Sequence, residues 1–157
     1  MFARLAIEDD IDAYVDLVRA AASESAPGFD FDAEKVRAHF DQYIREAHPT
    51  IFVVEQNRTP VAFMHATIND YFFTSGVFTT QEILYVHPDK RGTRAAALLL
   101  RAFVDWSDQL GALESTGGND NALTSDRTRK LLSRFGFETV GFFMRRRGAA
   151  HGQKRRH

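Results

Sequence analysis

Apolar residues recur with a helical period in the first third of the chain, in two stretches that predict two amphipathic helices. A weakly alternating strand over residues 2–7 comes first, and Asp9 or Asp10 can cap the first helix. SESAPG interrupts the pattern, and Asp32 caps the second helix. The apolar positions are Ile11, Tyr14, Val15, Val18 and Ala22 in the first helix, and Val36, Phe40, Tyr43, Ile44 and Ala47 in the second.

The pattern changes to that of β-strands over the middle of the chain. IFVVE (51–55) and PVAFMHATI (60–68) are rich in β-branched and apolar residues, and the turn QNRT between them predicts a hairpin. NDYFFTSG (69–76) is expected to be a loop or a ragged hairpin end, and VFTTQEILYVH (77–87) predicts a third strand. These segments together predict an antiparallel meander.

A strongly amphipathic helix is predicted from about Arg91, directly after the third of these strands. ALEST (112–116) then predicts a short strand, Ser125 caps a helix that Gly136 ends, and residues 137–146 predict a closing strand or tight hairpin. The order strand, helix, strand implies a right-handed crossover between parallel strands. The expected fold class is therefore α/β, with a mixed sheet that joins an antiparallel meander to a parallel crossover and helices on both faces.

Three cations, Lys90, Arg91 and Arg94, surround Gly92 where the third strand leads into this helix. Cations are unfavourable at a helix N-terminus, because the helix dipole is itself positive there. A bound anion would resolve the conflict, since free backbone N–H groups point outward from the first turn. Gly92 would let the backbone approach a ligand, and the small residues from Ala95 keep the first turn slim. Several converging donors suit a diphosphate better than a single carboxylate.

A solvated basic turn without a ligand is the alternative, because a motif with one glycine has low specificity. The spacings GxxxxGK[ST] and GxGxxG are both absent, so the turn is neither a Walker A loop nor a dinucleotide-binding loop. The position at the carboxyl end of a strand favours the anion site, since α/β folds bind ligands there.

The composition is that of one soluble domain. The chain has 157 residues and no cysteine, which excludes disulfides, thiolate metal sites and cysteine nucleophiles. No spacing of His, Asp and Glu indicates a metal site, no stretch is long enough to span a membrane, and the sequence starts without a signal-peptide pattern. We therefore expect a cytoplasmic protein with no metal cofactor and no membrane partner.

Charge is distributed unevenly along the chain. Residues 145–157 contain six Lys or Arg and no acid, whereas residues 1–57 contain 12 acids and 5 bases. We expect a single domain over residues 1–146, followed by a basic and disordered tail over residues 147–157. Such a tail is usually solvated, and contact with nucleic acid is the alternative.

These segments resemble the GCN5-related N-acetyltransferases (GNAT). The strand ILYV, the turn HPDKRGTRAAALLL, a short strand, a capped helix and RFGFETVG follow in the order of that family. The turn motif of the family is Arg/Gln-x-x-Gly-x-Gly/Ala; this chain has Arg91 and Ala96 at its ends but Arg94 in place of the central glycine. The resemblance extends from Phe2 to about Arg146, and TGGNDN is similar to phage-encoded acetyltransferase-like proteins.

The resemblance implies acetyl-CoA as the acetyl donor, lying where strand 77–87 and strand 112–116 separate. Backbone groups of the first strand would bond to the pantetheine arm, and amides of the turn would hold the diphosphate. Arg94 would then add a phosphate contact or cover the site. The implied cofactor-binding residues are Leu84, Tyr85, Val86, Arg91, Gly92, Thr93, Arg94, Ala95, Ala96 and Asn119.

Acetyl transfer to an amine needs a base for the ammonium, stabilisation of the carbonyl oxygen and a proton for the departing thiolate. The resemblance places Glu82 as the general base, and a solvent-facing position on the strand is the alternative. Where the family commonly has a tyrosine as acid, this chain has Leu132, which cannot donate a proton. The family asparagine that often precedes this helix falls near Ser125, so the resemblance gives Ser125 as the second candidate catalytic residue. Tyr85, Asn119 and Asn121 are the other candidates, or the thiolate leaves without an acid.

Three further features bear on the site. His65 could be a base that faces the cleft, although a packed or surface histidine is more common. The acidic segment AASESAPGFDFDAE suggests a cationic acceptor, attracted by Glu24, Asp30 and Asp32. The basic last helix, with Arg127, Arg129, Lys130 and Arg134, fits a solvated face or contact with the adenosine 3′-phosphate.

We therefore expect an acetyl-CoA-dependent N-acetyltransferase that acts on a primary amine, either of a small molecule or of a protein lysine or N-terminus, by direct attack in a ternary complex. The alternative is a catalytically weak protein of the same fold that binds nucleic acid or a host protein. Exposed strands near the C-terminus often pair in the family, which would give a homodimer. The expected location is the bacterial cytoplasm, or the host cytoplasm if a phage encodes the chain.

Overall fold

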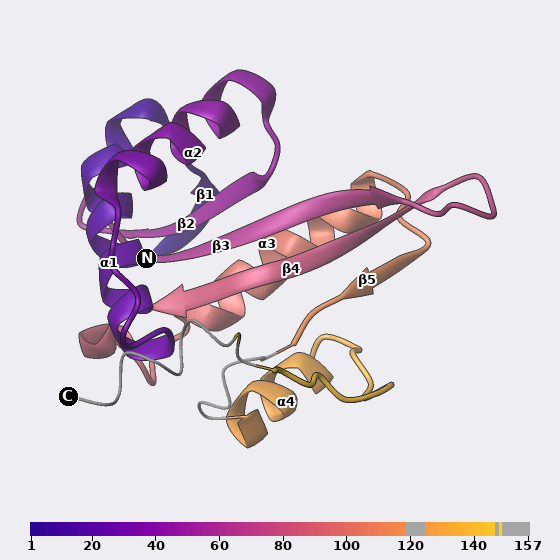
Figure 1. The fold of residues 1–157 in the computed structure, drawn as a ribbon. Helices are drawn as coiled ribbons and strands as arrows, with labels where there is room; N and C mark the ends of the chain where they lie inside the picture. The colour runs from indigo at the N-terminus through magenta and orange to yellow at the C-terminus, as the bar shows by residue number, and fades with distance from the viewer. Residues whose placement is uncertain (119–124, 147, 149–157) are drawn as a thin grey trace.

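Five strands form one sheet in the order β1-β2-β3-β4-β5, in a computed structural model that describes residues 1–118, 125–146 and 148. β1 to β4 pair antiparallel, and β5 pairs parallel with β4. This confirms the predicted mixed sheet (Figure 1). The strands are β1 (Phe2–Leu5), β2 (Thr50–Gln56), β3 (Thr59–Asp70), β4 (Val77–Val86) and β5 (Glu114–Thr116).

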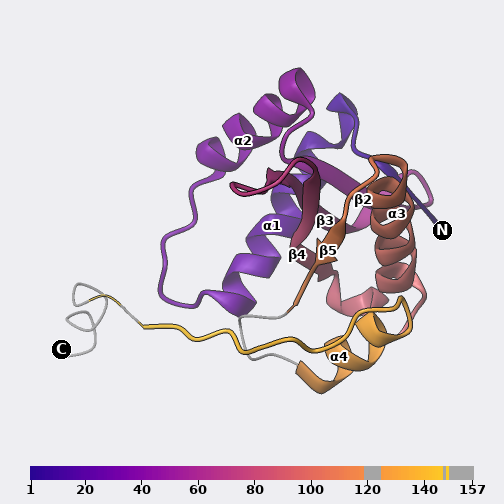
Figure 2. The ribbon, with the colours of Figure 1, turned by 90° about the vertical axis from the view of Figure 1, so that its right-hand side faces the viewer.

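Helices cover both faces of the sheet, as predicted. Figure 2 shows α1 and α2 on one side of the strands and α3 on the other, with α4 next to the lower end of α3. The helices are α1 (Ile11–Ser25), α2 (Ala33–Glu46), α3 (Ala95–Gln109) and α4 (Ser125–Ser133), and short 3-10 turns precede α1 at Glu8–Asp10 and α3 at Pro88–Lys90.

Alternate residues of β2 supply two separate hydrophobic cores. Ile51 and Val53 pack with α1 and α2, whereas Phe52 and Val54 pack with α3 and α4. Because both faces are buried, the strand is a continuous apolar run rather than an alternating one. Each fully buried side chain of this size stabilises the fold by roughly 1.5–3 kcal/mol.

The caps of the first two helices differ from each other. Asp32 caps α2 as predicted, because its carboxylate accepts a hydrogen bond from the backbone N–H of Lys35 at 3.0 Å. Asp10 precedes α1 but its side chain does not cap that helix. Its carboxylate instead pairs with Arg4 of β1 at 2.6 Å and accepts from the backbone N–H of Ile7 at 2.9 Å.

The predicted closing strand or hairpin over residues 137–146 is wrong, because these described residues form neither strand nor helix. A strand needs a neighbour for its backbone hydrogen bonds, and none of the described strands pairs with this segment. Its apolar side chains are exposed: Val140, Phe142, Phe143 and Met144. Asn119 and the tail, apart from Gly148, lie outside the described residues.

Helix α3 begins at Ala95 rather than at the predicted Arg91. Gly92 has a positive φ of 83°, which a helix cannot contain, and a Cβ added at Gly92 would meet no atom within 4 Å. Residues 91–94 therefore form a separate turn between β4 and α3, and this turn is the cationic segment of the sequence.

Candidate active site

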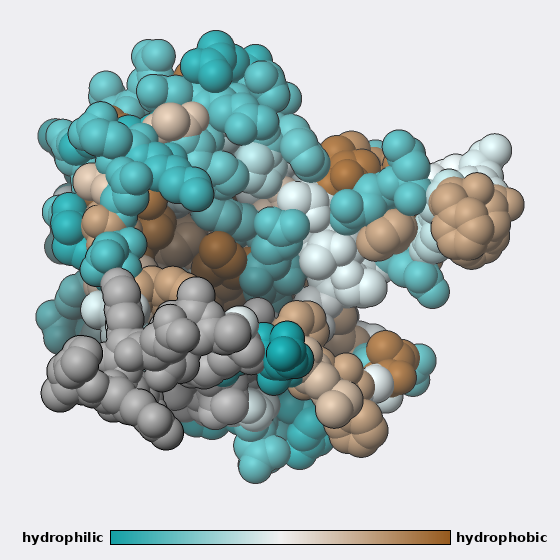
Figure 3. Space-filling model, in the orientation of Figure 1, coloured by the Kyte–Doolittle hydropathy of each residue, from teal (hydrophilic) through white to brown (hydrophobic). Residues whose placement is uncertain are grey.

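A gap opens between β4 and β5 because the two strands pair over only three residues. Phe78–Thr80 lies opposite Glu114–Thr116, and in the described part of the chain residues 81–86 of β4 have no partner on that side. Figure 1 shows β5 turning away while β4 continues towards the cationic turn. In the space-filling view, apolar surface lies at the bottom of a hollow below the α1–α2 part of the molecule (Figure 3). The expected separation of these two strands is therefore present.

A β-bulge interrupts β4 at Glu82. His65 lies opposite Ile83 and Ala66 lies opposite Gln81, so Glu82 is the extra residue between them. Bulges re-aim side chains and change which backbone groups face each edge of a strand. The sequence pattern of β4 gave no indication of this bulge.

The bulge decides which backbone groups of β4 face the gap. Before it, the carbonyl of Val77 accepts from the N–H of Leu113 at 2.9 Å, on the β5 side. After it, the N–H of His87 donates to the carbonyl of Val61 at 3.0 Å, on the β3 side. Since backbone groups alternate in direction along an antiparallel strand, those of Tyr85 also face β3. The N–H and C=O groups that face the gap are those of Leu84 and Val86.

The Glu82 side chain is exposed, in a polar strip on the same sheet face as α1 and α2. Its Oε1 accepts a hydrogen bond from Thr67 Oγ1 at 3.3 Å. Asn69 continues the strip, since its side-chain amide donates to the hydroxyls of Thr67 and Thr80 at 3.2 and 3.3 Å. The carboxylate is thus held at the gap by a neutral donor and stays open to solvent, which suits proton exchange with a bound acceptor.

Some backbone N–H groups of the cationic turn have no acceptor among the described residues. The amides of Arg91 and Thr93 donate to the carbonyls of Pro88 and Lys90 at 3.1 and 3.3 Å, and the amide of Ala95 donates to Thr93 Oγ1 at 3.3 Å. No acceptor among the described residues takes the amides of Gly92, Arg94 and Ala96. These alternate amides, at the positive end of α3, can bind the oxygens of a phosphate.

The Arg91 side chain makes an ion pair that the sequence did not indicate. Its Nη2 lies 2.6 Å from Glu24 Oε2, near the end of α1, and its Nε donates to the carbonyl of Val86 at 3.2 Å. The Tyr85 hydroxyl donates to the other oxygen of Glu24 at 2.7 Å. Partial burial opposes ionisation of Glu24, but the hydrogen bonds from Arg91 and Tyr85 outweigh it and hold the pKa of the carboxyl below its usual value. Burial, and then Glu24, raise the pKa of Tyr85 to about 12.

Arg94 is directed towards the N-terminus of the chain. Its Nη2 donates to the carbonyl of Met1 at 2.9 Å, so the guanidinium joins the turn to β1. Its backbone N–H remains one of the amides without an acceptor in the described chain. The substitution of the family's glycine by Arg94 therefore leaves the donor in place and directs the added side chain to Met1.

The candidates for the acid lie on different elements. Ser125 is exposed at the first residue of α4. Leu132 is buried in the core next to α3, where it acts as a packing residue. The hydroxyl proton of Tyr85 is engaged by Glu24. Asn119 and Asn121 fall outside the described residues.

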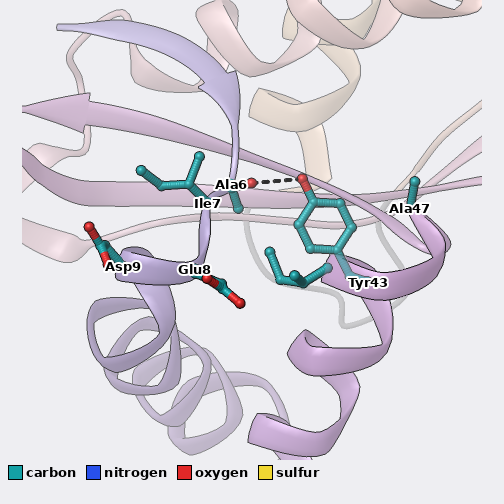
Figure 4. A pocket seen from close by; sticks show the side chains of 7 residues that line it. Ala6, Ile7, Glu8, Asp9, Tyr43 and Ala47 are labelled. Carbon is teal, nitrogen blue, oxygen red and sulfur yellow. Dashed lines mark hydrogen bonds between the residues drawn. The ribbon is translucent and has the colours of Figure 1, made fainter.

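Two hollows flank α1 and α2. One, of about 610 Å³, lies by β1 at the edge of the sheet furthest from the gap; Tyr43 there donates to the carbonyl of Ala6 at 2.9 Å (Figure 4). The other, of about 440 Å³, lies between the two helices over β3 and contains His65 and Tyr14. Tyr14 was predicted only as an apolar position of the first helix. The alternation of residues along β3 is the sequence signal that indicates a His65 facing the helices.

In the part of the chain that the structure describes, no helix could cross a bilayer and no His, Asp and Glu cluster could bind a metal.

The comparisons with known proteins agree with this architecture. The family model described as "Acetyltransferase (GNAT) family" matches residues 14–137. An aminoglycoside N-acetyltransferase, AAC(6')-Iy, solved with CoA, superposes with a TM-score of 0.73 at 19% identity, over 94% of this chain and 93% of that one. An acetyltransferase from Trypanosoma brucei superposes at 0.73 and 16% identity, over 92% and 97% of the two chains.

A third structure, described as a predicted acetyltransferase from Clostridium acetobutylicum with acetyl-CoA, superposes with a TM-score of 0.72 at 16% identity, over 99% of this chain and 98% of that one. A search of curated protein sequences found no significant match. At these identities the structures support the fold, whereas the family model covers most of the sequence. The chain therefore belongs to the GNAT family of acetyl-CoA-dependent N-acetyltransferases.

Proposed function

We propose that the protein acetylates a primary amine, of a small molecule or of a protein lysine or N-terminus, by direct attack of the amine within a ternary complex. The proposal rests on two features that are continuous along the chain. The edge of β4 beyond the bulge, which has no partner strand among the described residues, leads directly into the turn where the amides of Gly92, Arg94 and Ala96 have no acceptor in the described chain.

The donor set of this edge fits acetyl-CoA. Leu84 and Val86 would bond to the acetyl carbonyl and the pantetheine arm, and the amides of Gly92, Arg94 and Ala96 would bind the diphosphate. Lys90 and Arg91 add positive charge at the same turn. Acetyl-CoA, when bound, supplies an activated acetyl thioester, whose C–S bond breaks as the new C–N bond forms.

Glu82 is the proposed general base. An acceptor enters as an ammonium, and its nitrogen must lose a proton before it can attack a carbonyl carbon. The exposed carboxylate at the bulge can take that proton directly or through one water. Ser125 is the proposed proton donor to the departing thiolate, which also leaves readily without one because its conjugate acid is a weak acid of pKa about 8.5.

The base is tested with Glu82→Gln, which keeps the shape of the side chain and removes its charge. We expect kcat/KM for a screened amine to fall by about 10²–10⁴-fold, with little change in acetyl-CoA affinity measured by calorimetry. Glu138→Gln, at an exposed glutamate beyond α4, is the matched control and is expected to leave both quantities unchanged. An unchanged kcat/KM in Glu82→Gln would exclude Glu82 as the base.

The donor site is tested separately, by calorimetric binding of acetyl-CoA to the wild type and to the double variant Arg91→Glu, Arg94→Glu. We expect binding by the wild type and a loss of at least about tenfold in the variant, because two cations become anions beside a diphosphate. Equal binding by both proteins would show that the turn does not hold the phosphates.

A further inference from the structure

The cavity between α1 and α2 contains polar groups that the proposed chemistry does not use. Val18 and Val36 give it apolar walls, and His65 of β3 lies among its lining residues. His65 is 6% exposed, so a titratable ring has been placed in the core at the edge of this cavity. The other lining residues are Tyr14, Lys35, Ala38, His39 and Gln42.

A hydrogen bond to Tyr14 engages one of the two ring nitrogens of His65. Tyr14 Oη lies 2.5 Å from His65 Nε2, and the burial of both rings keeps both groups neutral. Burial raises the pKa of Tyr14, and burial, followed by the neighbouring His39, lowers the pKa of His65 to about 3. In the arrangement that we propose, Tyr14 donates to His65 Nε2, so that Nδ1 carries the hydrogen.

The Nδ1–H group of His65 is a donor without an acceptor among the described residues. It also retains access to open space. Among the described residues, Gln56 Oε1 is the fully enclosed side-chain atom that lacks a hydrogen-bond partner, so His65 Nδ1 is not fully enclosed. His65 lines the cavity, so we take the open space next to Nδ1 to be the cavity itself. The Nδ1–H is then available to an acceptor atom of a ligand bound in the cavity.

A second donor lies at the rim of the same cavity. Lys35 belongs to the first turn of α2, and the described residues provide no ion pair for its ammonium group. His39 stacks obliquely with His65, with the ring centroids 5.3 Å apart. The Gln42 side-chain amide is engaged by Glu46 at 3.1 Å. The polar groups of the lining without a partner in the described chain are therefore His65 Nδ1, the Lys35 ammonium, the His39 ring nitrogens and Gln42 Oε1, and Lys35 supplies the positive charge.

The cavity is one strand away from the proposed reaction centre. His65 lies directly opposite Ile83 of β4, on the same face of the sheet, and Ile83 is the residue between the Glu82 bulge and Leu84. A ligand that reaches from the bulge to Lys35 would therefore cross the half-exposed Ile83 and enter between α1 and α2.

We propose that this cavity binds a carboxylate at the far end of the acceptor, so that the substrate class is an amino carboxylate. The ammonium end lies at Glu82, the methylene groups lie against Val18 and Val36, and the carboxylate accepts hydrogen bonds from His65 Nδ1–H and the Lys35 ammonium. This inference rests on the proposed function for the ammonium end, whereas the carboxylate end is a separate binding site with its own test.

The first test compares acetylation of two matched series: ω-amino acids of increasing length, starting from glycine, and n-alkylamines with the same number of methylene groups. We expect the wild type to prefer the carboxylate series by at least about tenfold in kcat/KM at the best length. Lys35→Met should reduce that preference to about threefold or less, and Lys35→Arg should restore part of it. Lys130→Met, at an exposed lysine of α4, is the control.

The second test uses binding alone. The imidazole ¹H–¹⁵N signals of the wild type are followed by NMR during titration with butanoate, and with n-butylamine as the control. We expect butanoate to shift the His65 Nδ1 signal in the wild type and to shift it less in Lys35→Met, with no shift from n-butylamine.

The two tests separate the two proposals. A butanoate-dependent His65 shift without acetylation of any amine would leave the carboxylate site standing and overturn the proposed function. Acetylation of alkylamines at least as efficient as that of ω-amino acids of every length, or no butanoate shift of the His65 signal, would overturn the carboxylate site. An equal loss of kcat/KM for both substrate series in Lys35→Met would also overturn the carboxylate site, because the lysine would then not recognise the carboxylate.

Discussion

At the scale of single residues, the pair of Tyr14 and His65 gives a direct prediction of stability. Tyr14→Phe keeps the ring contacts with Phe40 and Phe63 but leaves His65 Nε2 buried without a donor. We expect the free energy of unfolding, measured in urea at neutral pH, to fall by about 1–3 kcal/mol. Tyr71→Phe, which removes an exposed hydroxyl bonded to Glu114, should change it by only about 0.5 kcal/mol. Equal losses in the two variants would contradict the buried hydrogen bond.

The neutral state of His65 predicts how stability depends on pH. The pKa of His65 is about 3 in the folded protein and about 6.5 when unfolded, so between these values the unfolded chain binds the extra proton. Stability must then fall as the pH falls below 6.5, by up to about 1.4 kcal/mol per pH unit from this residue alone.

This pH effect is measured as the difference between the wild type and His65→Gln, from urea unfolding at several values between about pH 6.5 and pH 5, above the range where carboxylates titrate. The wild type should lose stability more steeply than the variant as the pH is lowered. Parallel curves would show that His65 takes up its proton in the folded state as readily as in the unfolded chain.

The site residues differ in how far the sequence could predict them. Arg91, Gly92 and Ala96 could be proposed from the sequence because the cations, the glycine and the small residues are neighbours in the chain. The partner of Arg91 is Glu24, 67 residues away, and no local pattern relates the two. The tautomer of His65 likewise depends on Tyr14, 51 residues away. A motif of consecutive residues can be recognised in the sequence, whereas a pair of residues brought together by packing cannot.

At the scale of elements, the Glu24–Arg91 pair connects the end of α1 to the turn before α3. In our proposal a diphosphate at this turn competes with Glu24 for the guanidinium, and it is also repelled by the carboxylate. We expect Glu24→Gln to bind acetyl-CoA about two- to fivefold more tightly in calorimetry, the scale of a partly exposed ion pair. Glu34→Gln on α2 is the control. Weaker binding by Glu24→Gln would mean instead that the pair holds Arg91 in the geometry that binds phosphate.

The elements themselves follow from the sequence where burial is regular. β2 and β3 were predicted closely, because their apolar residues match the faces that they bury. The start of α3 was predicted four residues early, because the turn at Gly92 looks helical in composition but contains a positive φ. Residues 137–146 were predicted as a strand or tight hairpin, but the apolar content of a segment does not supply the neighbouring strand that a ladder requires.

At the scale of the whole molecule, the most exposed apolar side chains of the described residues lie in two segments. Phe142 and its neighbours follow α4, with Phe142 98% exposed. The tip of the β3–β4 hairpin, with Phe72 99% exposed, projects from the body (Figure 3). Contiguous apolar surface of this kind usually marks contact with another protein surface. The family resemblance predicts a homodimer. The segment after α4 and the β3–β4 tip are the apolar surfaces that we expect such a dimer to bury.

We therefore predict self-association through the segment after α4. Sedimentation velocity between about 5 and 200 µM should show a mass that increases with concentration, because association follows mass action. The double variant Phe142→Ser, Phe143→Ser should remain a monomer over the same range. The same two changes at the hairpin tip, Phe72→Ser and Phe73→Ser, remove equivalent apolar surface and tell which segment carries the contact. A wild type that stays monomeric throughout would contradict the prediction. Association lost only with the hairpin variant would move the interface from the segment after α4 to the β3–β4 tip.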